Sequence, residues 1–313
     1  MTAAQTRPIV NLGIFVADCS FRAARLPRLG ETLLGQSFAL GPGGKGSNQS
    51  VASAMAGGRV HFITRLGDDD FARMAEGIWA KAGVIPEVTV DRDSFTGAAA
   101  ILIEDGSGNN GIIVTPGAAS RITPGDVEAR RALIEGAAVF ITQLEQPVPA
   151  ALRGLQIARA AGVTTILNPA PAAELPAEIF PLCDYLTPNE TEAELLTGIP
   201  VTGPASAEAA ADALLAKGVG AVVMTLGAAG ALYRDRGTSL HLPVIPAGKV
   251  VETTGAGDAF NGGFAVALAE GRPVAEAIRF AAATAGISVT RPGTAASMPT
   301  RAEIDALLAA AAG

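Results

Sequence analysis

Short runs of Val, Ile and Leu alternate along the chain with longer Ala-rich stretches in which apolar residues recur at helical spacing. The short runs are apolar at every position, which is typical of strands buried on both faces of a parallel sheet. We predict such strands at 9–16, 60–64, 139–142, 164–167 and 221–225, and helices at 47–56, 70–82, 149–161, 205–217, 257–270 and 274–289. The alternation implies βαβ units, and therefore an α/β fold with helices on both faces of a mostly parallel sheet.

Two segments break this alternation. Residues 18–45 contain several glycines and prolines and no helical pattern, and residues 94–117 have the pattern of a hairpin with strands at 98–103 and 111–115. Both hairpin strands are apolar on both faces, so a free-standing hairpin would expose a large apolar surface. We therefore predict one domain, 1–313, with a small β-sheet lid formed by 18–45 and 94–117 and covered by a ligand or a second subunit.

Composition narrows the choice of partners. The chain is 49% hydrophobic and 17% charged, which is enough for a large core. A net charge of −7 and an aromatic content of 4% argue against nucleic acid, which binds basic or stacking surfaces. No run approaches the roughly 20 apolar residues that cross a bilayer, and Cys19 and Cys183 have no Cys/His cluster around them. We expect a cytoplasmic protein without a nucleic-acid or membrane partner.

The densest glycine cluster is Gly-Pro-Gly-Gly-Lys-Gly-Ser-Asn at 41–48. It matches G-x-G-x-x-G formally, but it comes well after the first strand, and Arg59 stands where a dinucleotide site requires an acid. It is not a P-loop, because Gly46 follows Lys45. A glycine turn entering the next helix explains the cluster, and so does a close approach of sugar hydroxyls to Lys45 and Asn48. The residues alone leave both interpretations open.

A second glycine cluster, at 253–263, opens an apolar helix. Glycines at a helix start expose N–H groups, and the helix dipole adds partial positive charge there. Asp258 in the first turn has a simple interpretation as a cap, but three small residues precede it where capping requires one. A carboxylate beside an anion hole is what phosphoryl transfer to an alcohol requires, because the carboxylate accepts the hydroxyl proton.

Several polar residues follow the predicted strands, namely Asp18, Glu145, Asn168 and Thr225. The carboxyl ends of parallel strands meet at one edge of a sheet, and open α/β sheets bind ligands there. Farther along, Asn189 and Glu192 have the spacing of a capping box at a helix start. The same spacing recurs at 123/126 and 300/303, so the residues alone favour the capping box over a functional role.

Three motifs together resemble those of the ribokinase (PfkB-type) family of sugar kinases: G-G-K-G-S-N at 43–48, T-P-N-E-T-E at 187–192 and T-T-G-A-G-D-A-F-N-G at 253–262. Their order and spacing match, as do linking segments at 167–172 and 277–281, and the resemblance runs from about residue 9 to about residue 308. It implies a ribokinase-like three-layer αβα body with a β-lid that also forms the interface of a homodimer. It also overturns the capping-box interpretation of Asn189 and Glu192, which in this family organise the water shell of magnesium and phosphate.

The resemblance implies a role for each matching residue. Asp258 is the expected catalytic base, and the expected anion hole is formed by Gly255, Ala256 and Gly257. The residues expected to bind sugar hydroxyls are Asp18, Gly44, Lys45, Asn48, Glu145 and Asp258. Those expected on the nucleotide side are Asn189, Thr225, Gly227, Gly230 and Gly257, with Asn189 and Glu192 acting on Mg²⁺ through water. A monovalent-cation site, with K⁺ as the ion, is implied at Glu252, Thr254, Ser288, Arg291, Gly293 and Ser297.

The chain departs from the family pattern at three positions. Val16 stands where the family usually has Asn, so one hydrogen bond to a sugar hydroxyl is lost. Glu252 replaces the usual Asp of the cation site and is one methylene longer. Ala282 replaces a His often found near the adenine, which leaves that ring packed by small apolar residues.

These features predict an ATP- and Mg²⁺-dependent kinase that phosphorylates the primary hydroxyl of a small sugar, with ribose as the first expectation. Val16 motivates an alternative in which the acceptor is a nucleoside, fructose or a sugar acid. A catalytically silent sugar-binding protein is a third hypothesis, and the intact Gly-Ala-Gly-Asp run at 255–258 speaks against it. A nicotinamide oxidoreductase ranks last, because the glycine motif is in the wrong place.

Overall fold

The computed structural model describes residues 7–106 and 109–311. Within these residues, the main sheet has nine strands in the order β13-β12-β11-β10-β9-β8-β1-β4-β5. All neighbours from β11 to β5 pair in parallel, and β12 and β13 form an antiparallel edge. The strands are β1 Ile9–Leu12, β4 Val60–Leu66, β5 Ile85–Val90, β8 Val139–Thr142, β9 Thr164–Leu167, β10 Tyr185–Leu186, β11 Ala221–Thr225, β12 Ala231–Arg234 and β13 Ser239–Leu242. The predicted mostly parallel sheet is confirmed.

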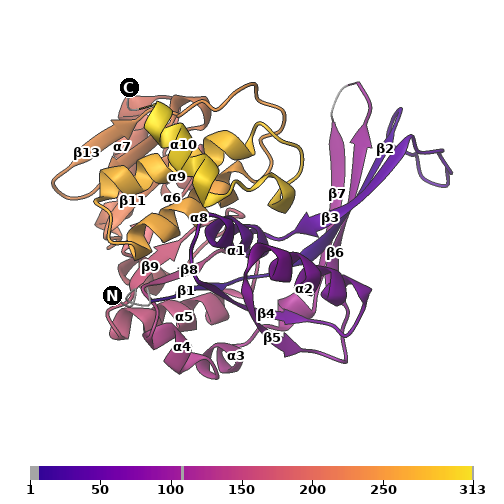
Figure 1. The fold of residues 1–313 in the computed structure, drawn as a ribbon, viewed down its shortest axis with the longest axis horizontal. Coiled ribbons are helices and arrows are strands. Elements are labelled where there is room, and N and C mark those ends of the chain that lie inside the picture. Colours follow the sequence, from indigo (N-terminus) through magenta and orange to yellow (C-terminus); the bar gives the residue numbers. More distant parts are fainter. Residues whose placement is uncertain (1–6, 107–108, 312–313) are drawn as a thin grey trace.

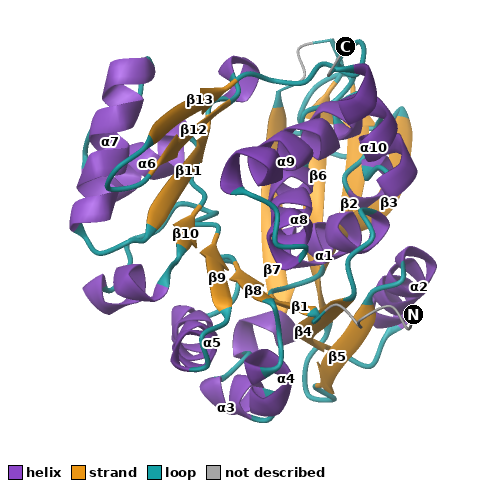
Figure 2. Cartoon of the chain, turned by 60° about the vertical axis from the view of Figure 1, so that its left-hand side comes forward, coloured by secondary structure: helices purple, strands orange, loops and turns teal. Residues whose placement is uncertain are grey.

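Helices cover both faces of the sheet (Figure 2). One layer contains α3 Pro124–Glu128, α4 Arg131–Glu135, α5 Val148–Ala160, α6 Glu190–Thr197 and α7 Pro204–Ala216. The other contains α1 Lys45–Met55, α2 Asp70–Ala82, α8 Ala256–Ala269, α9 Val274–Ser288 and α10 Arg301–Ala310. The three-layer αβα arrangement predicted from the alternation is therefore present.

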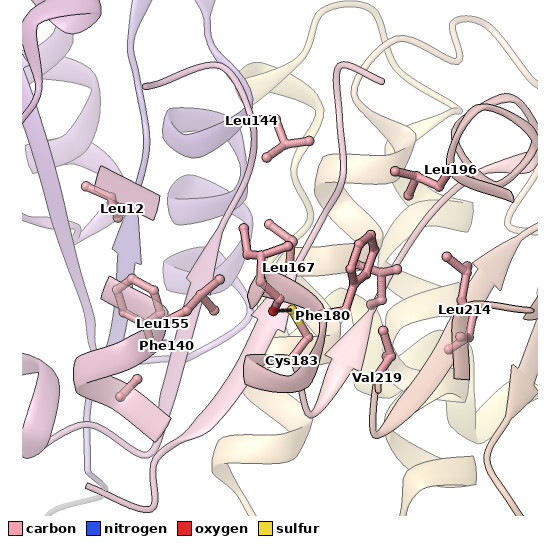
Figure 3. Close-up of a cluster of buried hydrophobic side chains, with 14 of the residues drawn as sticks. Leu12, Phe140, Leu144, Leu155, Leu167, Phe180, Cys183, Leu196, Leu214 and Val219 are labelled. Carbon is pink, nitrogen blue, oxygen red and sulfur yellow. Dashed lines mark hydrogen bonds between the residues drawn. The ribbon is translucent and has the colours of Figure 1, made fainter. Parts of the chain in front are cut away.

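The central strands of the main sheet contribute to two hydrophobic cores. In β8, Val139 and Ile141 belong to the core under α8 and α9, whereas Phe140 belongs to the core under α5 and α7. Figure 3 shows the second core, with Phe140, Leu167 and Leu214 among its members. Successive side chains of a strand point to opposite faces, so burial on both faces explains why these segments are apolar at every position.

A second sheet stands apart from the body (Figure 1). It has four strands in the order β3-β2-β6-β7, and these are β2 Val16–Ala23, β3 Ser37–Gly43, β6 Thr96–Glu104 and β7 Asn110–Gly117. They fall in the two segments from which the lid is predicted, and residues 107 and 108 of the hairpin turn lie outside the described residues. Adjacent residues of β7, Ile112 and Ile113, point to opposite faces and are 53% and 69% exposed. Apolar surface is thus present on both faces of this sheet, as predicted.

The structure corrects two predicted boundaries. The expected strand at 9–16 is wrong, because β1 ends at Leu12 and Val16 already begins β2 in the second sheet. As a consequence, Asp18 lies inside a strand of the second sheet instead of following a strand of the main one. The helix expected at 47–56 begins earlier, at Lys45, because Gly44 provides the backbone turn before it. Among the helices of the described residues, none has the length and apolar character needed to cross a membrane.

Candidate active site

A cavity of about 160 Å³ opens at the carboxyl edge of the main sheet. Loops after β9, β10 and β11 form part of its wall, and the first turns of α1, α6 and α8 form the rest. The lining residues are Lys45, Asn168, Ala170, Thr187, Asn189, Glu192, Thr225, Gly255, Gly257, Asp258 and Asn261. This cavity therefore brings together the predicted base, two of the three residues of the predicted anion hole, and part of the predicted nucleotide side.

A wider hollow of about 450 Å³ lies at the opposite, amino edge of the sheet. Its charged groups are already paired, since Arg159 forms an ion pair with Asp184 and the Tyr233 hydroxyl donates to Asp235. Helix N-termini, which would attract a phosphate, point to the carboxyl edge in βαβ units. We therefore place the active site at the carboxyl edge.

The start of α1 is shaped by Gly44 and by a carboxylate from a distant loop. Gly44 has φ +88°, and a Cβ there would lie 2.5 Å from the carbonyl oxygen of Ile14, so the position favours glycine on both counts. The Lys45 N–H then donates to Glu145 Oε2 at 2.7 Å. Glu145 follows β8, so the first turn of α1 is attached to the carboxyl edge of the sheet, where both residues are predicted to bind sugar.

Asp258 occupies the first turn of α8 and is 6% exposed. The residue before the helix, Gly255, has φ +82°, a left-handed conformation that an L-residue with a Cβ rarely adopts. Helix geometry leaves the N–H groups of this turn without an intrahelical partner. The N–H of Ala256 donates to the carbonyl of Thr253 at 3.1 Å, so Gly255 and Gly257 are better placed than Ala256 to hold an anion.

Close packing of α1 against α8 brings the two glycine motifs together. Gly262 faces α1 so closely that a Cβ there would lie 2.5 Å from the Cβ of Ala52. Ser53 Oγ donates to the Gly262 carbonyl at 3.1 Å and ties the two helices at the same point. With the helices this close, Asn48 Nδ2 donates to Asp258 Oδ2 at 3.1 Å, although the two residues are 210 positions apart.

Burial raises the pKa values of the carboxyl groups around the cavity. Desolvation raises the pKa of Glu145 to about 7 and that of Asp18 to about 6. It also raises the pKa of Asp258, while Lys45 and the amides of Gln49 and Asn48 act in the opposite direction. A buried carboxylate with a raised pKa in a cleft is typical of a proton-transfer site.

Several of the residues predicted to bind the sugar lie near Asp258. The Asp18 carboxylate rests against Gly43, where a Cβ would meet its Oδ1 at 2.3 Å. The Asp18 charge also contributes to the raised pKa of Glu145, so the two carboxylates lie near each other. Asn48 is 4% exposed, and its Oδ1 has no hydrogen-bond partner among the described residues. Since a buried acceptor without a donor is costly, Asn48 Oδ1 is suited to accept from a ligand hydroxyl.

On the nucleotide side, the capping box at Asn189 and Glu192 is formed. Asn189 Oδ1 accepts from the Glu192 N–H at 2.8 Å, and Glu192 Oε2 accepts from the Asn189 N–H at 2.9 Å. The capping box predicted from the residues is therefore present, and both side chains also line the cavity, so their role on Mg²⁺ and phosphate stays a prediction. Thr225, the last residue of β11, forms an isolated parallel β-bridge with Asn189, and the predicted Gly227 and Gly230 follow it in the next turn.

The residues predicted for a monovalent cation lie around the end of α9, outside this cavity. Glu252 Oε2 accepts from the Gly293 N–H at 2.8 Å. The hydroxyls of Ser288 and Ser297 donate to carbonyls three residues back, and Arg291 pairs with Glu303; Thr254 precedes α8. Cation binding by Glu252, Thr254, Ser288, Arg291, Gly293 and Ser297 stays a prediction. In the described part of the chain, no three His, Cys, Asp or Glu residues cluster as metal ligands.

Sequence reasoning missed a group of buried amides behind Asp258. Gln49 and Gln143 are 0% exposed and Asn11 is 1% exposed. A signal was present, since the helix predicted at 47–56 carries Asn, Gln and three Ser residues without a continuous apolar stripe. Asn11 likewise interrupts an otherwise apolar strand. Polar residues in segments that must be buried indicate a hydrogen-bonded network.

Comparisons with known proteins show which family the chain resembles over its length. Residues 7–301 match the model of the pfkB family carbohydrate kinases. The chain is 39% identical to a ribokinase of Haemophilus influenzae over 298 residues, which covers 95% of this chain and 97% of that one. It is 34% identical over 296 residues to a deoxyribokinase of Salmonella typhimurium, covering 93% and 95%.

Among solved structures, a ribokinase of Arabidopsis thaliana complexed with ribose and ATP has a TM-score of 0.90 and 32% identity, covering 97% of this chain and 99% of that one. The family match spans nearly the whole chain and includes both glycine motifs and the loop at 187–192. This chain therefore belongs to the pfkB family of carbohydrate kinases.

Proposed function

We propose that the chain is an ATP-dependent ribokinase, which transfers the γ-phosphoryl group of ATP to the primary hydroxyl of ribose to give ribose 5-phosphate. The observation that carries the proposal is Asp258, a buried carboxylate that lines the cavity at the N-terminus of α8. The curated ribokinase and the ribose- and ATP-bound ribokinase described above support ribose and ATP as the two substrates.

In the proposed mechanism, Asp258 accepts the proton of the sugar hydroxyl while the hydroxyl oxygen bonds to the γ-phosphorus. The bond between that phosphorus and the bridging oxygen of ATP breaks, and ADP leaves. The N–H groups of Gly255 and Gly257, at the positive end of α8, stabilise the charge on the transferring group. Asp18, Gly44, Lys45, Asn48 and Glu145 hold the sugar hydroxyls, and Thr225, Gly227 and Gly230 line the nucleotide.

The charge of the site fits a divalent cation. Asp18, Glu145, Glu192 and Asp258 outweigh the single positive charge of Lys45, so ATP alone would be repelled. Burial also raises the pKa of Glu192, and a nearby cation would lower that pKa again because it stabilises the ionised carboxylate. We infer that Asn189 and Glu192 hold Mg²⁺ through its water shell, because Mg²⁺ prefers oxygen ligands and keeps several waters. When bound, Mg²⁺ neutralises phosphate charge.

Val16 motivates a second candidate for the sugar that accepts the phosphoryl group, other than ribose. This side chain is 5% exposed, has no polar atom, and lies on the same face of β2 as Asp18. An apolar wall beside Asp18 cannot hydrogen-bond a hydroxyl, so the site also accommodates an acceptor that lacks one hydroxyl, as the name of the deoxyribokinase relative indicates. Nucleoside, fructose and sugar-acid acceptors remain within the same hypothesis.

An ATP-consumption screen tests the function. Ribose, 2-deoxyribose, fructose, sugar acids and nucleosides are compared by kcat/KM, with and without Mg²⁺ and K⁺, and the phosphorylated carbon is identified by NMR. We expect ribose to give the highest kcat/KM and the 5-phosphate as product. Faster turnover of another acceptor would replace ribose but keep the kinase. No turnover with any acceptor would favour a silent sugar-binding protein.

We also propose that the chain is a homodimer that buries its second sheet. Phe38 of β3 and Ile113 of β7 are 58% and 69% exposed, and such a surface is typical of an interface. We expect Ile113→Glu to give a monomer in sedimentation velocity while the wild type is a dimer. Leu195→Glu, at an apolar position of α6 that is 52% exposed, is the matched control and should stay dimeric. A monomeric wild type would contradict the proposal.

Activation by K⁺ and a cytoplasmic location stay predictions.

A further inference from the structure

Both oxygens of the Asp258 carboxylate accept a hydrogen bond from an amide of α1. Asn48 Nδ2 donates to Oδ2 at 3.1 Å, and Gln49 Nε2 donates to Oδ1 at 3.0 Å. Gln49 is 0% exposed and does not line the cavity, so its side chain does not contact a ligand there directly. We propose that Gln49 is a positioning residue that orients the Asp258 carboxylate for proton transfer, an inference that rests on the proposed function.

A network of buried amides runs from Asn11 through Gln143 and Gln49 to Asn168. The contacts at its two ends determine the direction of its hydrogen bonds. Asn11 Nδ2 donates to the carbonyl oxygen of Gly46 at 2.9 Å. Asn168 Nδ2 donates to the carbonyl oxygen of Thr187 at 2.9 Å. A carbonyl oxygen only accepts, so the amide nitrogens must face these carbonyls. The Oδ1 atoms of Asn11 and Asn168 are therefore acceptors for the residues between them.

Gln143 and Gln49 connect these two ends. Gln143 Nε2 donates to Asn11 Oδ1 at 2.9 Å and to Gln49 Oε1 at 2.6 Å. Gln49 Nε2 then donates one proton to Asn168 Oδ1 at 3.1 Å and the other to Asp258. A flipped Gln49 amide would place its oxygen against two acceptors, which is unfavourable in a buried site. The N–H of Gln49 is therefore held on Asp258 Oδ1.

This arrangement determines which lone pairs of Asp258 remain for the substrate. A carboxylate has about four acceptor positions, and the two amides occupy one on each oxygen. Asp258 lines the cavity, so a substrate hydroxyl there can use one of the positions left over. Hydrogen bonds to the ionised form favour it, so Gln49 also opposes the effect of burial and keeps the carboxylate ready to accept a proton.

Charged groups from four other elements face the same site. Lys45 of α1 stabilises the ionised carboxylate, whereas Glu145 after β8 and Glu192 of α6 repel it, and Asp18 of β2 faces Glu145. None of these groups changes when Gln49 is substituted. A shift in the titration of Asp258 in a Gln49 variant therefore reports the lost amide.

The test uses Gln49→Met, which keeps the length of the side chain without its donors, and Gln49→Asn, which keeps an amide but is one methylene too short to reach Asp258. The rate of ribose phosphorylation is measured against pH. An amide donor to a charged group shifts the acid limb of kcat/KM upward by about one to two pH units when it is lost. We expect kcat at the optimum to fall about 10-fold or more, because the carboxylate is no longer aligned, while the KM for ATP is unchanged.

Gln146→Met is the matched control. Gln146 is 2% exposed and its Nε2 donates to Thr142 Oγ1 at 2.7 Å, away from Asp258. We expect this variant to lose thermal stability without a shift of the acid limb. An unshifted limb in either folded Gln49 variant, or an equal shift in Gln146→Met, would overturn the inference. Gln49→Asn decides it if Gln49→Met does not fold.

The variant Asp258→Asn separates this inference from the proposed function. If the wild type phosphorylates no acceptor, the proposed function is wrong. If Asp258→Asn keeps its turnover, the proposed base is wrong and the role of Gln49 fails with it, although the kinase activity stands. If Asp258→Asn is inactive while the acid limb of both Gln49 variants is unshifted, the function stands and only the positioning role of Gln49 fails.

Discussion

The close crossing of α1 and α8 at Gly262 should be essential for turnover. The perturbation is Gly262→Ala, which adds one methyl group to the interior of α8. Its Cβ would lie 2.5 Å from the Cβ of Ala52 and 2.9 Å from both the carbonyl oxygen of Gln49 and the N–H nitrogen of Ser53. Ordinary contacts at Cβ are 3.4–4 Å, and two of the three neighbours are backbone atoms, which cannot rotate away.

The helices must therefore separate by about 1 Å, as expected for overpacking of a tight interface. The hydrogen bonds from Asn48 and Gln49 to Asp258, at 3.1 and 3.0 Å, would lengthen beyond useful range. A misplacement of about 1 Å costs about 100-fold in rate. Overpacking of this kind also costs about 1–3 kcal/mol, and an unfolding entropy of about 2 cal/mol/K per residue converts that to a fall in Tm of about 2–5 °C.

The assay measures kcat/KM for ribose by coupled ATP consumption and Tm by scanning calorimetry. Gly77→Ala is the matched control, because Gly77 lies inside α2 and a Cβ there meets nothing within 4 Å. That variant should keep full activity and gain up to about 1 kcal/mol from helix propensity. Wild-type kcat/KM and Tm in Gly262→Ala would refute the idea that close packing positions the amides.

Further predictions concern the carboxylates. Asp258→Asn should keep nucleotide binding, measured by calorimetry, and lower kcat by about 10²–10⁴-fold, the usual range for a lost general base; near-normal turnover would contradict the mechanism. The pKa of Glu145 is about 7 in the folded protein against an ordinary value of 4.5, so its ionisation opposes folding as pH rises between these values. Glu145→Gln should therefore be more stable than the wild type at pH 8 by about 1–3 kcal/mol and no more stable at pH 4. Urea unfolding at both pH values measures the difference, and an equal difference at both would show that it does not arise from titration.

Local patterns predicted most elements of the body. The strands at 139–142, 164–167 and 221–225 are found within the predicted bounds, because burial on both faces leaves a continuous apolar run. The predicted strand at 9–16 failed for the same reason. Its apolar run continues from β1 of the main sheet into β2 of the second sheet, and a pattern of side chains does not record that the chain changes sheet over residues 13–15.

Two motifs show a similar division within the site. The residues at 253–258 predict a helix start with exposed N–H groups and a carboxylate, and the structure has that arrangement at α8. The Asn189 and Glu192 spacing predicts a capping box, and the capping box is formed. Neither motif predicts how close it lies to the glycine cluster at 41–48, because those distances depend on how helices far apart in the chain pack, as α1 packs on α8.

The sequence alone therefore determined the αβα body, the segments of the second sheet and the chemistry of the glycine motifs, since each of these follows from local spacing and backbone preference. Only the tertiary structure decided that Gln49 meets Asp258, 209 residues away, and that Asn11 and Gln143 hold it there. The physical reason is that a hydrogen bond depends on tenths of an ångström, and here that distance is set by how closely Gly262 lets two helices pack.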